Sequence, residues 1–255
     1  LCIIFFMFLF SILEAKSDFD IVFGVAGIYS QSKYRDKKES IAGFPFLNIQ
    51  YKNIYWQGME IGCYIYDKKR MKIALDMEYA NAGYNGKHRD EYGNIDEDDV
   101  YYEDMKDRDS EIRTGIGLVY QGKYGIEVRG KINQDISGKS NSLKSKFGVQ
   151  AGYPIMKKLF FIAELESSYY SKEYVDYYYG VRPEEVKSDI GRNLYIGEAA
   201  IVNSVSYGFL YFIKNNFNVM LLGKTEFLPN EIQNSPMVND SKTNSVILMF
   251  NYKIY

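Results

Sequence analysis

The last thirteen residues, 243–255, constrain the fold most, because their side chains alternate strictly in polarity. One face is wholly apolar and consists of Val246, Leu248, Phe250, Tyr252 and Ile254. The other face is mixed and carries Ser245, Asn251 and Lys253, with Ile247 and Met249 between them. This pattern, ending near an aromatic carboxyl terminus, is typical of the closing strand of an outer-membrane β-barrel. An edge strand of a soluble β-sandwich would look similar, so the rest of the chain must decide.

The same two-residue alternation recurs along the chain. It is clearest in residues 19–26, 72–79, 124–133, 143–151 and 217–227. The 255 residues leave room for one large all-β domain, and 25 tyrosines favour strands and interfacial girdles. Mean hydropathy is only −0.31, but a transmembrane barrel has a polar lumen and need not be hydrophobic on average.

Charge and cysteine content exclude several classes of function. The 31 basic and 33 acidic residues nearly balance, which argues against a nucleic-acid binder that depends on phosphate contacts. Apart from Cys2, the only cysteine is Cys63, and no Cys/His cluster is spaced for zinc. Cys63 falls on an apolar strand face, so we expect a packed or lipid-facing side chain.

The amino terminus predicts export. Residues 1–13 are apolar apart from Cys2 and Ser11, a length that suits a signal-peptide core and is too short for a helical membrane span. We therefore expect a signal peptide over residues 1–15, with cleavage at Ala15, and a mature barrel domain over residues 16–255. Because the usual basic start and initiator Met are absent, we expect the front of the sequence to be truncated.

The spacing of the connections predicts a closed antiparallel barrel. Short connections, at 67–70, 121–123, 154–157 and 214–216, alternate with longer polar ones at 30–43, 84–109, 137–142, 171–192 and 228–242. Short periplasmic turns and longer extracellular loops are the outer-membrane rule.

The number of strands depends on two long segments, 47–65 and 195–213, which each keep one apolar parity. Because a hairpin turn with an odd number of residues, or a bulge, is expected to break that parity, we interpret each segment as one long strand. This gives about ten strands. If Lys52–Asn53 is instead a turn, the alternation of short and long connections requires one further strand, and the count is twelve.

Four motifs in order resemble the MltA-interacting protein family (MipA/OmpV) of Gram-negative outer-membrane proteins. They are MKDRDSEIRTG at 105–115, INQDISGKS at 132–140, YVDYYYGVRPEEV at 174–186, and SPMV at 235–238 leading into FNYKI at 250–254. Here Ile254 takes the place of the family's terminal aromatic, and Tyr255 is one residue extra. The resemblance implies a scaffold that holds a membrane-bound lytic transglycosylase (a murein hydrolase) near a murein synthase, which is a penicillin-binding protein.

Catalytic and metal-binding chemistry has weak support. His88 is the only histidine, with Asp90 close by, and it lies in the most polar loop, where a solvated side chain is the default. The same loop, 84–109, holds ten Asp and Glu residues. They could bind Ca²⁺ or bridge divalent ions to lipopolysaccharide, but they lack EF-hand spacing, so hydrated charge is the favoured interpretation.

Lumen and girdle positions complete the sequence-based picture. Glu164 and Glu166 share one strand face and could suggest a glycosidase pair, but we expect them to line the lumen and pair with Lys144, Lys146 or Arg129. Residues 183–189 predict a helical turn or two within a loop. The tyrosine cluster could bind sugar rings, but we expect an aromatic girdle; it comprises Tyr169, Tyr170, Tyr174, Tyr177, Tyr178 and Tyr179.

We therefore predict a monomeric all-β outer-membrane barrel that is not an enzyme, with no catalytic, cofactor-binding or metal-binding residues. Its partners would be the bilayer and lipopolysaccharide, together with the two murein enzymes. A ten-stranded barrel is narrow, which favours a plugged lumen. The alternative function is a narrow channel for small polar solutes. Protruding strand ends near Tyr66 and Tyr195 are the expected protein-contact surface.

Overall fold

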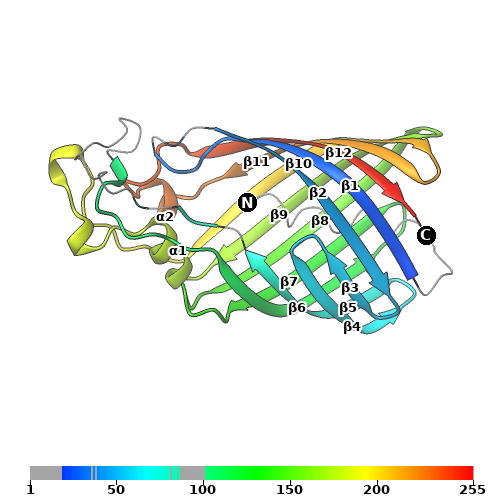
Figure 1. Ribbon diagram of the computed structural model, residues 1–255, viewed down its shortest axis with the longest axis horizontal. Coiled ribbons are helices and arrows are strands. Elements are labelled where there is room, and N and C mark those ends of the chain that lie inside the picture. Colours follow the sequence, from blue (N-terminus) through cyan, green and yellow to red (C-terminus); the bar gives the residue numbers. More distant parts are fainter. Residues whose placement is uncertain are drawn as a thin grey trace.

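The computed structural model describes residues 19–35, 37, 39–80, 82–84, 86 and 101–254, and it is a closed antiparallel β-barrel (Figure 1). The predicted signal peptide at 1–15 and His88 lie outside the described residues. The twelve strands are β1 (Phe19–Ser30), β2 (Ser40–Tyr51), β3 (Ile54–Gln57), β4 (Glu60–Lys68), β5 (Met71–Ala80), β6 (Glu111–Gln121), β7 (Ile126–Asp135), β8 (Leu143–Met156), β9 (Leu159–Tyr170), β10 (Ala200–Lys214), β11 (Phe217–Phe227) and β12 (Lys242–Lys253). No helix within the described ranges is long and apolar enough to cross a membrane.

The closing strand has the predicted orientation. β12 pairs with β11 on one side and with β1 on the other, so no free sheet edge remains at the junction of the termini. The predicted apolar face, from Val246 to Ile254, is 40% to 50% exposed. The alternate residues Ser245, Ile247 and Asn251 are buried in the lumen. The outward face of the barrel is therefore the apolar one, as a bilayer requires.

Twelve strands replace the preferred count of ten. The segment 47–65 is not one strand, because Tyr51 pairs with Ile54 across a two-residue turn and Gln57 pairs with Glu60 across a second one. Each two-residue turn reverses which parity faces outward, so two of them in succession restore it. The expectation that an odd-numbered turn breaks parity was wrong. The second long segment does contain a single strand, β10, which has 15 residues.

The short strand β3 leaves a notch in the described barrel wall. β2 pairs with β1 along its whole length, but only its residues 48–51 pair with β3. Residues 40–43 are exposed on both faces, and Ile41 is 85% exposed. Pro45, which lacks an N–H group, stands in this part of β2, where proline is tolerated because one edge needs no ladder bond. The notch lies in the extracellular half of the wall.

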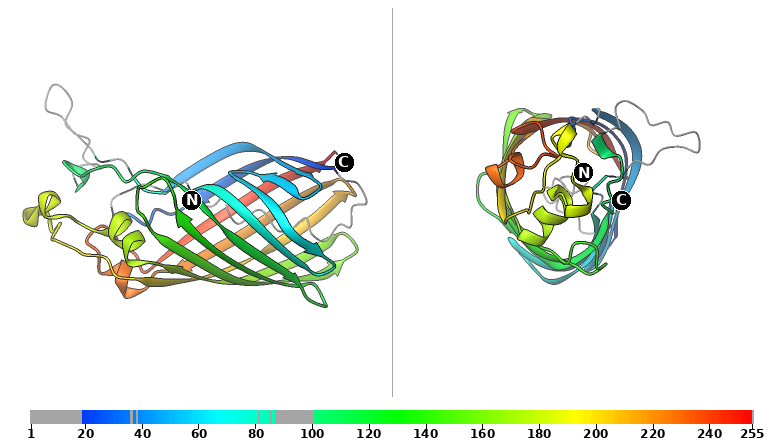
Figure 2. Two further views of the ribbon diagram at one scale, coloured as in Figure 1. Left: turned by 90° about the horizontal axis from the view of Figure 1, so that it is seen from below. Right: turned by 90° about the vertical axis from the view of Figure 1, so that its left-hand side faces the viewer.

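The two ends of the barrel differ in structure. At one end the strands are joined by tight turns, and at the other lie longer loops that contain α1 (Lys172–Tyr179) and α2 (Asn230–Gln233) (Figure 1). Residues 183–189 form the predicted helical turns, as two 3-10 helices at Pro183–Glu185 and Ser188–Ile190. Seen end-on, α1 lies inside the ring of strands (Figure 2). We call the described parts of loops 31–39, 82–110, 171–199 and 228–241 the extracellular cap.

The tyrosine cluster is not a lipid-facing girdle, contrary to the sequence-based expectation. Only Tyr169 faces outward at 38% exposure, whereas Tyr170, Tyr174, Tyr178 and Tyr179 are buried beneath the cap. Tyr170 and Tyr174 lie 4.5 Å apart between ring centroids, and Tyr174 and Tyr178 lie 4.7 Å apart. The rings form the core that joins α1 to the barrel mouth, because a helix inside a polar lumen must bury its own apolar face.

Candidate functional site

The lumen has two chemically different walls. One wall is apolar and contains a buried cluster from β1, β9, β10, β11 and β12, with phenylalanines of β2 packed against it. The opposite wall, from β4 to β9, carries the buried charged residues Glu60, Asp76, Glu78, Glu127, Lys144 and Glu164, together with Arg113. Because strand side chains alternate, each wall is one face of a set of neighbouring strands. The lumen is therefore amphipathic across its width.

A cavity of about 370 Å³ lies between the two walls. Its lining includes Lys144, Lys146, Tyr170 and Tyr174 from the charged side and the cap, with Ile247 from the apolar side. It extends to residues beside the notch, including Ser40, Met59 and Tyr79. Pockets that hold small organic molecules begin at about this size. The described side chains therefore leave an internal space within the twelve-stranded ring. That the lumen is plugged against the passage of solutes stays a prediction.

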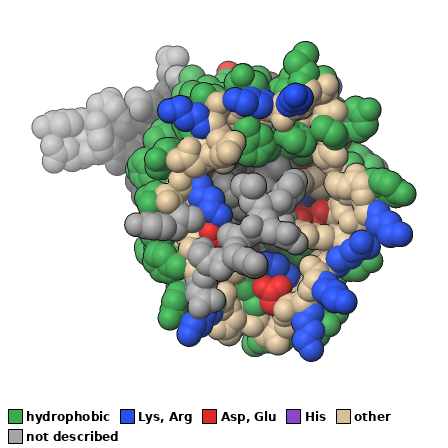
Figure 3. All heavy atoms as spheres, turned by 90° about the vertical axis from the view of Figure 1, so that its right-hand side faces the viewer, with side chains coloured by type: hydrophobic (Ala, Val, Ile, Leu, Met, Phe, Trp, Pro, Cys, Tyr) green, Lys and Arg blue, Asp and Glu red, His purple; other side chains and the backbone are tan. Residues whose placement is uncertain are grey.

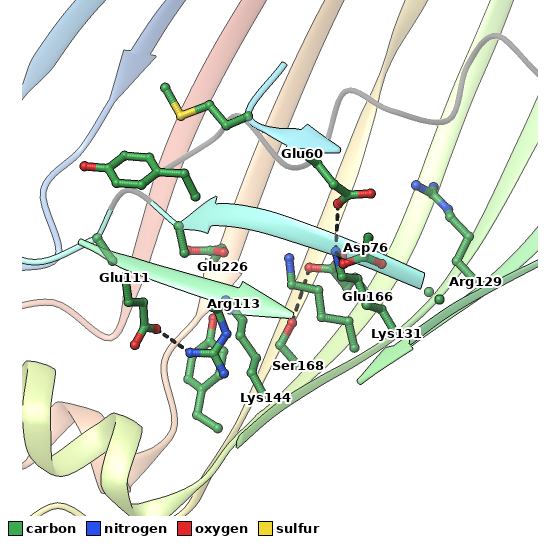
Figure 4. A pocket seen from close by; sticks show the side chains of 18 of the residues that line it. Glu60, Asp76, Glu111, Arg113, Arg129, Lys131, Lys144, Glu166, Ser168 and Glu226 are labelled. Atoms are coloured by element: carbon green, nitrogen blue, oxygen red, sulfur yellow. Dashed lines mark hydrogen bonds and ion pairs between the residues drawn. The ribbon is translucent and has the colours of Figure 1, made fainter. Parts of the chain in front are cut away.

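Three carboxylates converge on one ammonium group in the charged wall. The Nζ of Lys131 lies 2.7 Å from Glu60, 2.8 Å from Asp76 and 2.7 Å from Glu78. Figure 4 shows Lys131 with the first two of these acids. These carboxylate oxygens lie close enough together to hold a metal ion, and the lysine occupies the centre that such an ion would take. Removing one partner of a buried ionic group leaves the charges of the others buried without a counter-charge. Lys131 therefore holds β4, β5 and β7 together.

The predicted lumen positions of Glu164 and Glu166 are confirmed, and one predicted partner is correct. Glu164 lies 2.6 Å from the guanidinium of Arg129. Glu166 does not pair with Lys144 or Lys146; its nearest ion-pair partner is Lys224 on β11, at 3.6 Å. Each acid thus has a basic partner two strands away in the barrel wall, Arg129 on β7 and Lys224 on β11.

Lys144 and Lys146 stand apart from the other basic residues of the lumen. Each of Lys33, Arg113, Arg129, Lys131 and Lys224 has a carboxylate partner within 4 Å. Among the described residues, neither Lys144 nor Lys146 has an ion pair or a hydrogen bond. Lys144 is only 9% exposed, and its Nζ lies 4.8 Å from the ring centroid of Tyr170 and 5.4 Å from that of Tyr174. Figure 4 shows it among the side chains that surround the cavity.

The extracellular cap is held together by buried arginines. Arg108 makes a bidentate ion pair with Glu185, with N–O distances of 3.0 and 2.8 Å, and both side chains are fully buried. Its Nε also donates to the carbonyl of Tyr177 at 2.6 Å. Arg192 donates to the carbonyls of Glu185 and Glu103 at 2.7 and 3.0 Å. These bonds join the loop before β6 to the loop between β9 and β10.

Tyrosine hydroxyls attach the remaining two loops to the cap. Tyr101 donates to the carbonyl of Pro236, and Tyr102 donates to the carbonyl of Arg35, both at 2.6 Å. One apolar cluster includes residues of these loops together with Tyr170, Ala200 and Val202 from the barrel wall. The cap is therefore a packed structure that covers the extracellular mouth of the barrel.

Burial within the cap affects the acid–base behaviour of Glu185. Burial alone would raise the pKa of Glu185, but its hydrogen bonds with Arg108 and with the backbone N–H of Arg182 lower it below the ordinary value. Conversely, burial raises the pKa of Tyr84, which lies beside Arg108. Both groups are thus held in one charge state at neutral pH.

The opposite, periplasmic end carries a ring of exposed basic side chains (Figure 3). We call this ring the basic rim, and it consists of Lys52, Lys68, Lys69, Arg70, Lys123, Lys157, Lys158 and Lys214. All eight are exposed and lie in or beside the tight turns. Among the described residues at this end, Asp67 is the only exposed acid, and it lies 3.3 Å from Lys72. Asp20 is paired with Lys253 at 2.6 Å.

Aromatic rings place the basic rim relative to the membrane. Outward-facing tyrosines directly above the turns include Tyr51, Tyr66, Tyr120, Tyr153 and Tyr252. Lys52 and Lys68 extend over the rings of Tyr51 and Tyr66, at 5.2 and 5.7 Å. Since interfacial tyrosines mark the headgroup level, the basic rim lies just beyond it, facing the periplasm.

Other residues singled out by the sequence lie at separate places. Of the ten acids in loop 84–109, Glu103 and Asp104 pair with Lys187, and Asp109 pairs with Lys139. Asp107 accepts a hydrogen bond from the backbone of Gly86, and the other six acids lie in or beside the undescribed segment. Cys63 faces outward from β4 and accepts a hydrogen bond from Asn53, which fits its predicted surface position.

Sequence reasoning missed α1 and the basic rim. A signal for α1 was present, because Tyr174, Val175, Tyr178 and Tyr179 recur with the spacing of one helix face. The lysines of the rim were visible in the short connections, but they become one surface only after the strand order places all the turns at one end. The unpaired state of Lys144 depends on distances across the lumen, and strand periodicity does not contain them.

Comparisons with known proteins agree with this architecture. Residues 23–254 match the family model described as MltA-interacting protein MipA. A relative from Escherichia coli O157:H7, named "Putative outer membrane protein YiaT", is 22% identical over 237 residues, which are 93% of this chain and 92% of that relative. The "24 kDa outer membrane protein" of Pasteurella multocida strain Pm70 is 23% identical over 152 residues, or 59% of each chain.

Two solved porin structures also match this chain. The NanC porin has a TM-score of 0.44 at 9% identity, covering 90% of this chain and 98% of that one. The KdgM porin has a TM-score of 0.42 at 8% identity, covering 91% and 99%. The family match extends over nearly the whole described barrel, from β1 to the residue after β12. The chain therefore belongs to the MltA-interacting protein family of outer-membrane β-barrels.

Proposed function

We propose that this barrel is a scaffold that holds peptidoglycan-remodelling enzymes, a lytic transglycosylase and a murein synthase of the penicillin-binding class, at its periplasmic end. The basic rim carries the proposal, because the described residues at this end include eight exposed cations and only one exposed acid, Asp67. The barrel itself has no catalytic role in this proposal. Its outward apolar face contacts lipid, and its cap faces lipopolysaccharide. The family's description as a MltA-interacting protein points in the same direction.

The form of the rim favours electrostatic recruitment. The periplasmic turns are short and build no separate domain, so a large apolar docking area is absent from the described turns. A ring of like charge concentrates acidic partner surfaces and speeds their encounter, with a strong dependence on ionic strength. Of the two contact points expected from the sequence, Tyr66 lies near the rim. Tyr195 does not, because it bridges to Val181 within the extracellular cap.

A pull-down with the purified barrel tests this proposal. A soluble lytic transglycosylase and a penicillin-binding protein are each offered to immobilised barrel at low salt and at 0.3 M salt. We expect retention that falls with salt and that is lost in the triple variant Lys68→Glu, Lys69→Glu, Arg70→Glu. The matched control reverses three exposed lysines near the other end, Lys139, Lys172 and Lys242. Failure of the unmodified barrel to retain either enzyme would remove the scaffold function.

A narrow channel is the second candidate, and the internal cavity of about 370 Å³ is the observation that favours it. Planar-bilayer conductance separates the two functions. A scaffold with its mouth covered by the cap should be electrically silent. Steady single-channel steps from the unmodified protein would favour the channel instead.

A further inference from the structure

We propose that the lumen cavity is a binding site for a small organic anion, whose carboxylate contacts Lys144 and Lys146 and whose apolar part lies against Tyr170, Tyr174 and the facing wall. This site is separate from the basic rim and does not depend on the scaffold function. It follows from Lys144 and Lys146, the two lumen cations that have no carboxylate within ion-pair distance in the described part of the chain.

The first step is the state of Lys144. Its side chain is nine-tenths buried, and it lines the cavity. Among the described residues, its Nζ makes cation–π contacts with the rings of Tyr170 and Tyr174, at 4.8 and 5.4 Å from the ring centroids. A cation–π contact is weaker than the hydration that a buried ammonium loses. The ammonium group is therefore held in place and largely shielded from bulk solvent, but lacks a contacting counter-charge.

The second step is the contrast with the adjacent lumen cations. In the strand register, Lys146 pairs with Lys131 of β7 and Lys144 pairs with Asn133. Lys131 contacts three carboxylates, whereas Lys144 and Lys146 contact none within 4 Å. Glu78, one of these three acids, attracts both ammonium groups through space, but it makes no direct ion pair with either. A bound carboxylate would supply the direct contact that this arrangement lacks.

The third step concerns the non-ionic part of the ligand. The rings of Tyr170 and Tyr174 lie beside Lys144, and Ile247 of the apolar cluster lines the same cavity. The volume suits a molecule of modest size rather than a polymer. The cavity also extends to Ser40, Met59 and Tyr79 beside the notch. There it comes close to the apolar outer surface of the barrel. An anion with an apolar body fits both the lining and this position better than an inorganic ion does.

Titration calorimetry on the full chain in detergent tests the site with three matched probes: 4-phenylbutyrate, its neutral amide, and 4-phenylbutylamine. We expect the carboxylate to bind at least about tenfold more tightly than the amide, and the amine not to bind. Acetate should bind at least about tenfold more weakly than 4-phenylbutyrate, because it lacks the apolar part. Equal binding of carboxylate and amide would overturn the anion site, and equal binding of acetate would overturn its apolar half.

Variants assign the effect to the proposed residues. Lys144→Met and Lys146→Met should each weaken binding of 4-phenylbutyrate about tenfold or more, whereas Lys144→Arg should keep most of it. Lys158→Met, a rim residue distant from the cavity, is the control. The heat-induced shift of the unboiled band on a gel confirms that each variant is a folded barrel. Unchanged affinity in both folded methionine variants would refute the proposal.

Discussion

The two ends of this barrel use charge in opposite ways. In the cap, Arg108 and Glu185 form a fully buried ion pair, and the guanidinium of Arg192 is buried against backbone carbonyls. At the basic rim, eight cations are exposed, and Asp67 is the only exposed acid at the described periplasmic end. The cap therefore uses ionic groups to hold loops together, whereas the rim leaves its charge available to the surroundings.

This difference separates structural charge from functional charge. The loss of one partner from a buried ion pair destabilises a fold strongly, because the other charge stays buried without compensation. Exposed charges contribute little to stability, and like charges placed close together repel each other. A ring of exposed cations on tight turns therefore adds little to stability, and the proposed recruitment of an anionic partner would account for it.

The largest expected effect is at the cap. Arg108→Met leaves the buried Glu185 carboxylate without its partner, and we expect the cap to lose about 3–5 kcal/mol of stability. Loops 101–109 and 171–199 should then become sensitive to trypsin, while the strands stay protected. Limited proteolysis followed by mass spectrometry identifies the cut sites.

The double variant Arg108→Met, Glu185→Met is the control for this experiment. It removes both charges and should restore much of the protection, because replacing a whole buried pair by apolar side chains is often nearly neutral. If the single variant is as resistant as the unmodified protein, the cap is not held by this ion pair.

The next effect is a pH dependence confined to the cap. The folded pKa of Glu185 lies below its unfolded value near 4.3. Its contribution to stability is therefore complete above that value and is lost as the pH falls through the lower folded pKa. Tryptophan fluorescence is of little use here, because Trp56 lies in the barrel wall. Hydrogen exchange at pH 6 and pH 3, with each rate divided by the intrinsic amide rate at that pH, should instead show lower protection in α1 at pH 3 and unchanged protection in β8 to β11. An equal loss of protection throughout the barrel would contradict this prediction.

A smaller effect on stability is expected at the rim. Reversing Lys68, Lys69 and Arg70 to Glu should change the unfolding free energy by no more than about 0.5 kcal/mol per site, because these side chains are exposed. Urea unfolding in detergent measures it. A large destabilisation would mean that the rim is structural, and the contrast between the two ends would fail.

The outer face of the barrel could be predicted from the sequence because strand periodicity records it. Alternation in 243–255 correctly assigned Phe250 to lipid and Asn251 to the lumen. The same reasoning could not count strands around Lys52, since two short turns cancel each other in parity. Periodicity states which face a residue occupies, but not how many times the chain reverses.

The interior was less predictable, because it depends on contacts between distant strands. Glu164 was expected to face a basic residue, and Arg129 is that residue. The buried tyrosines of α1 were assigned to a girdle because aromatic residues are suited to both environments. Only the position of the helix inside the barrel mouth separates the two interpretations, and that position is set by Arg108 and Glu185 from different loops.

A single substitution tests backbone strain in the rim itself. Lys69 has φ of +48°, a left-handed conformation that glycine adopts more easily than lysine. Lys69→Gly should therefore stabilise the barrel by up to about 1 kcal/mol while weakening retention of the murein enzymes. Arg70→Gly is the matched control, because Arg70 has no positive φ: it removes one rim charge without relieving strain, so retention should weaken with no gain in stability. Higher stability together with weaker retention in Lys69→Gly would mean that a lysine occupies this position for binding, although the backbone conformation favours glycine. If Lys69→Gly left retention unchanged, this lysine would have no part in recruitment.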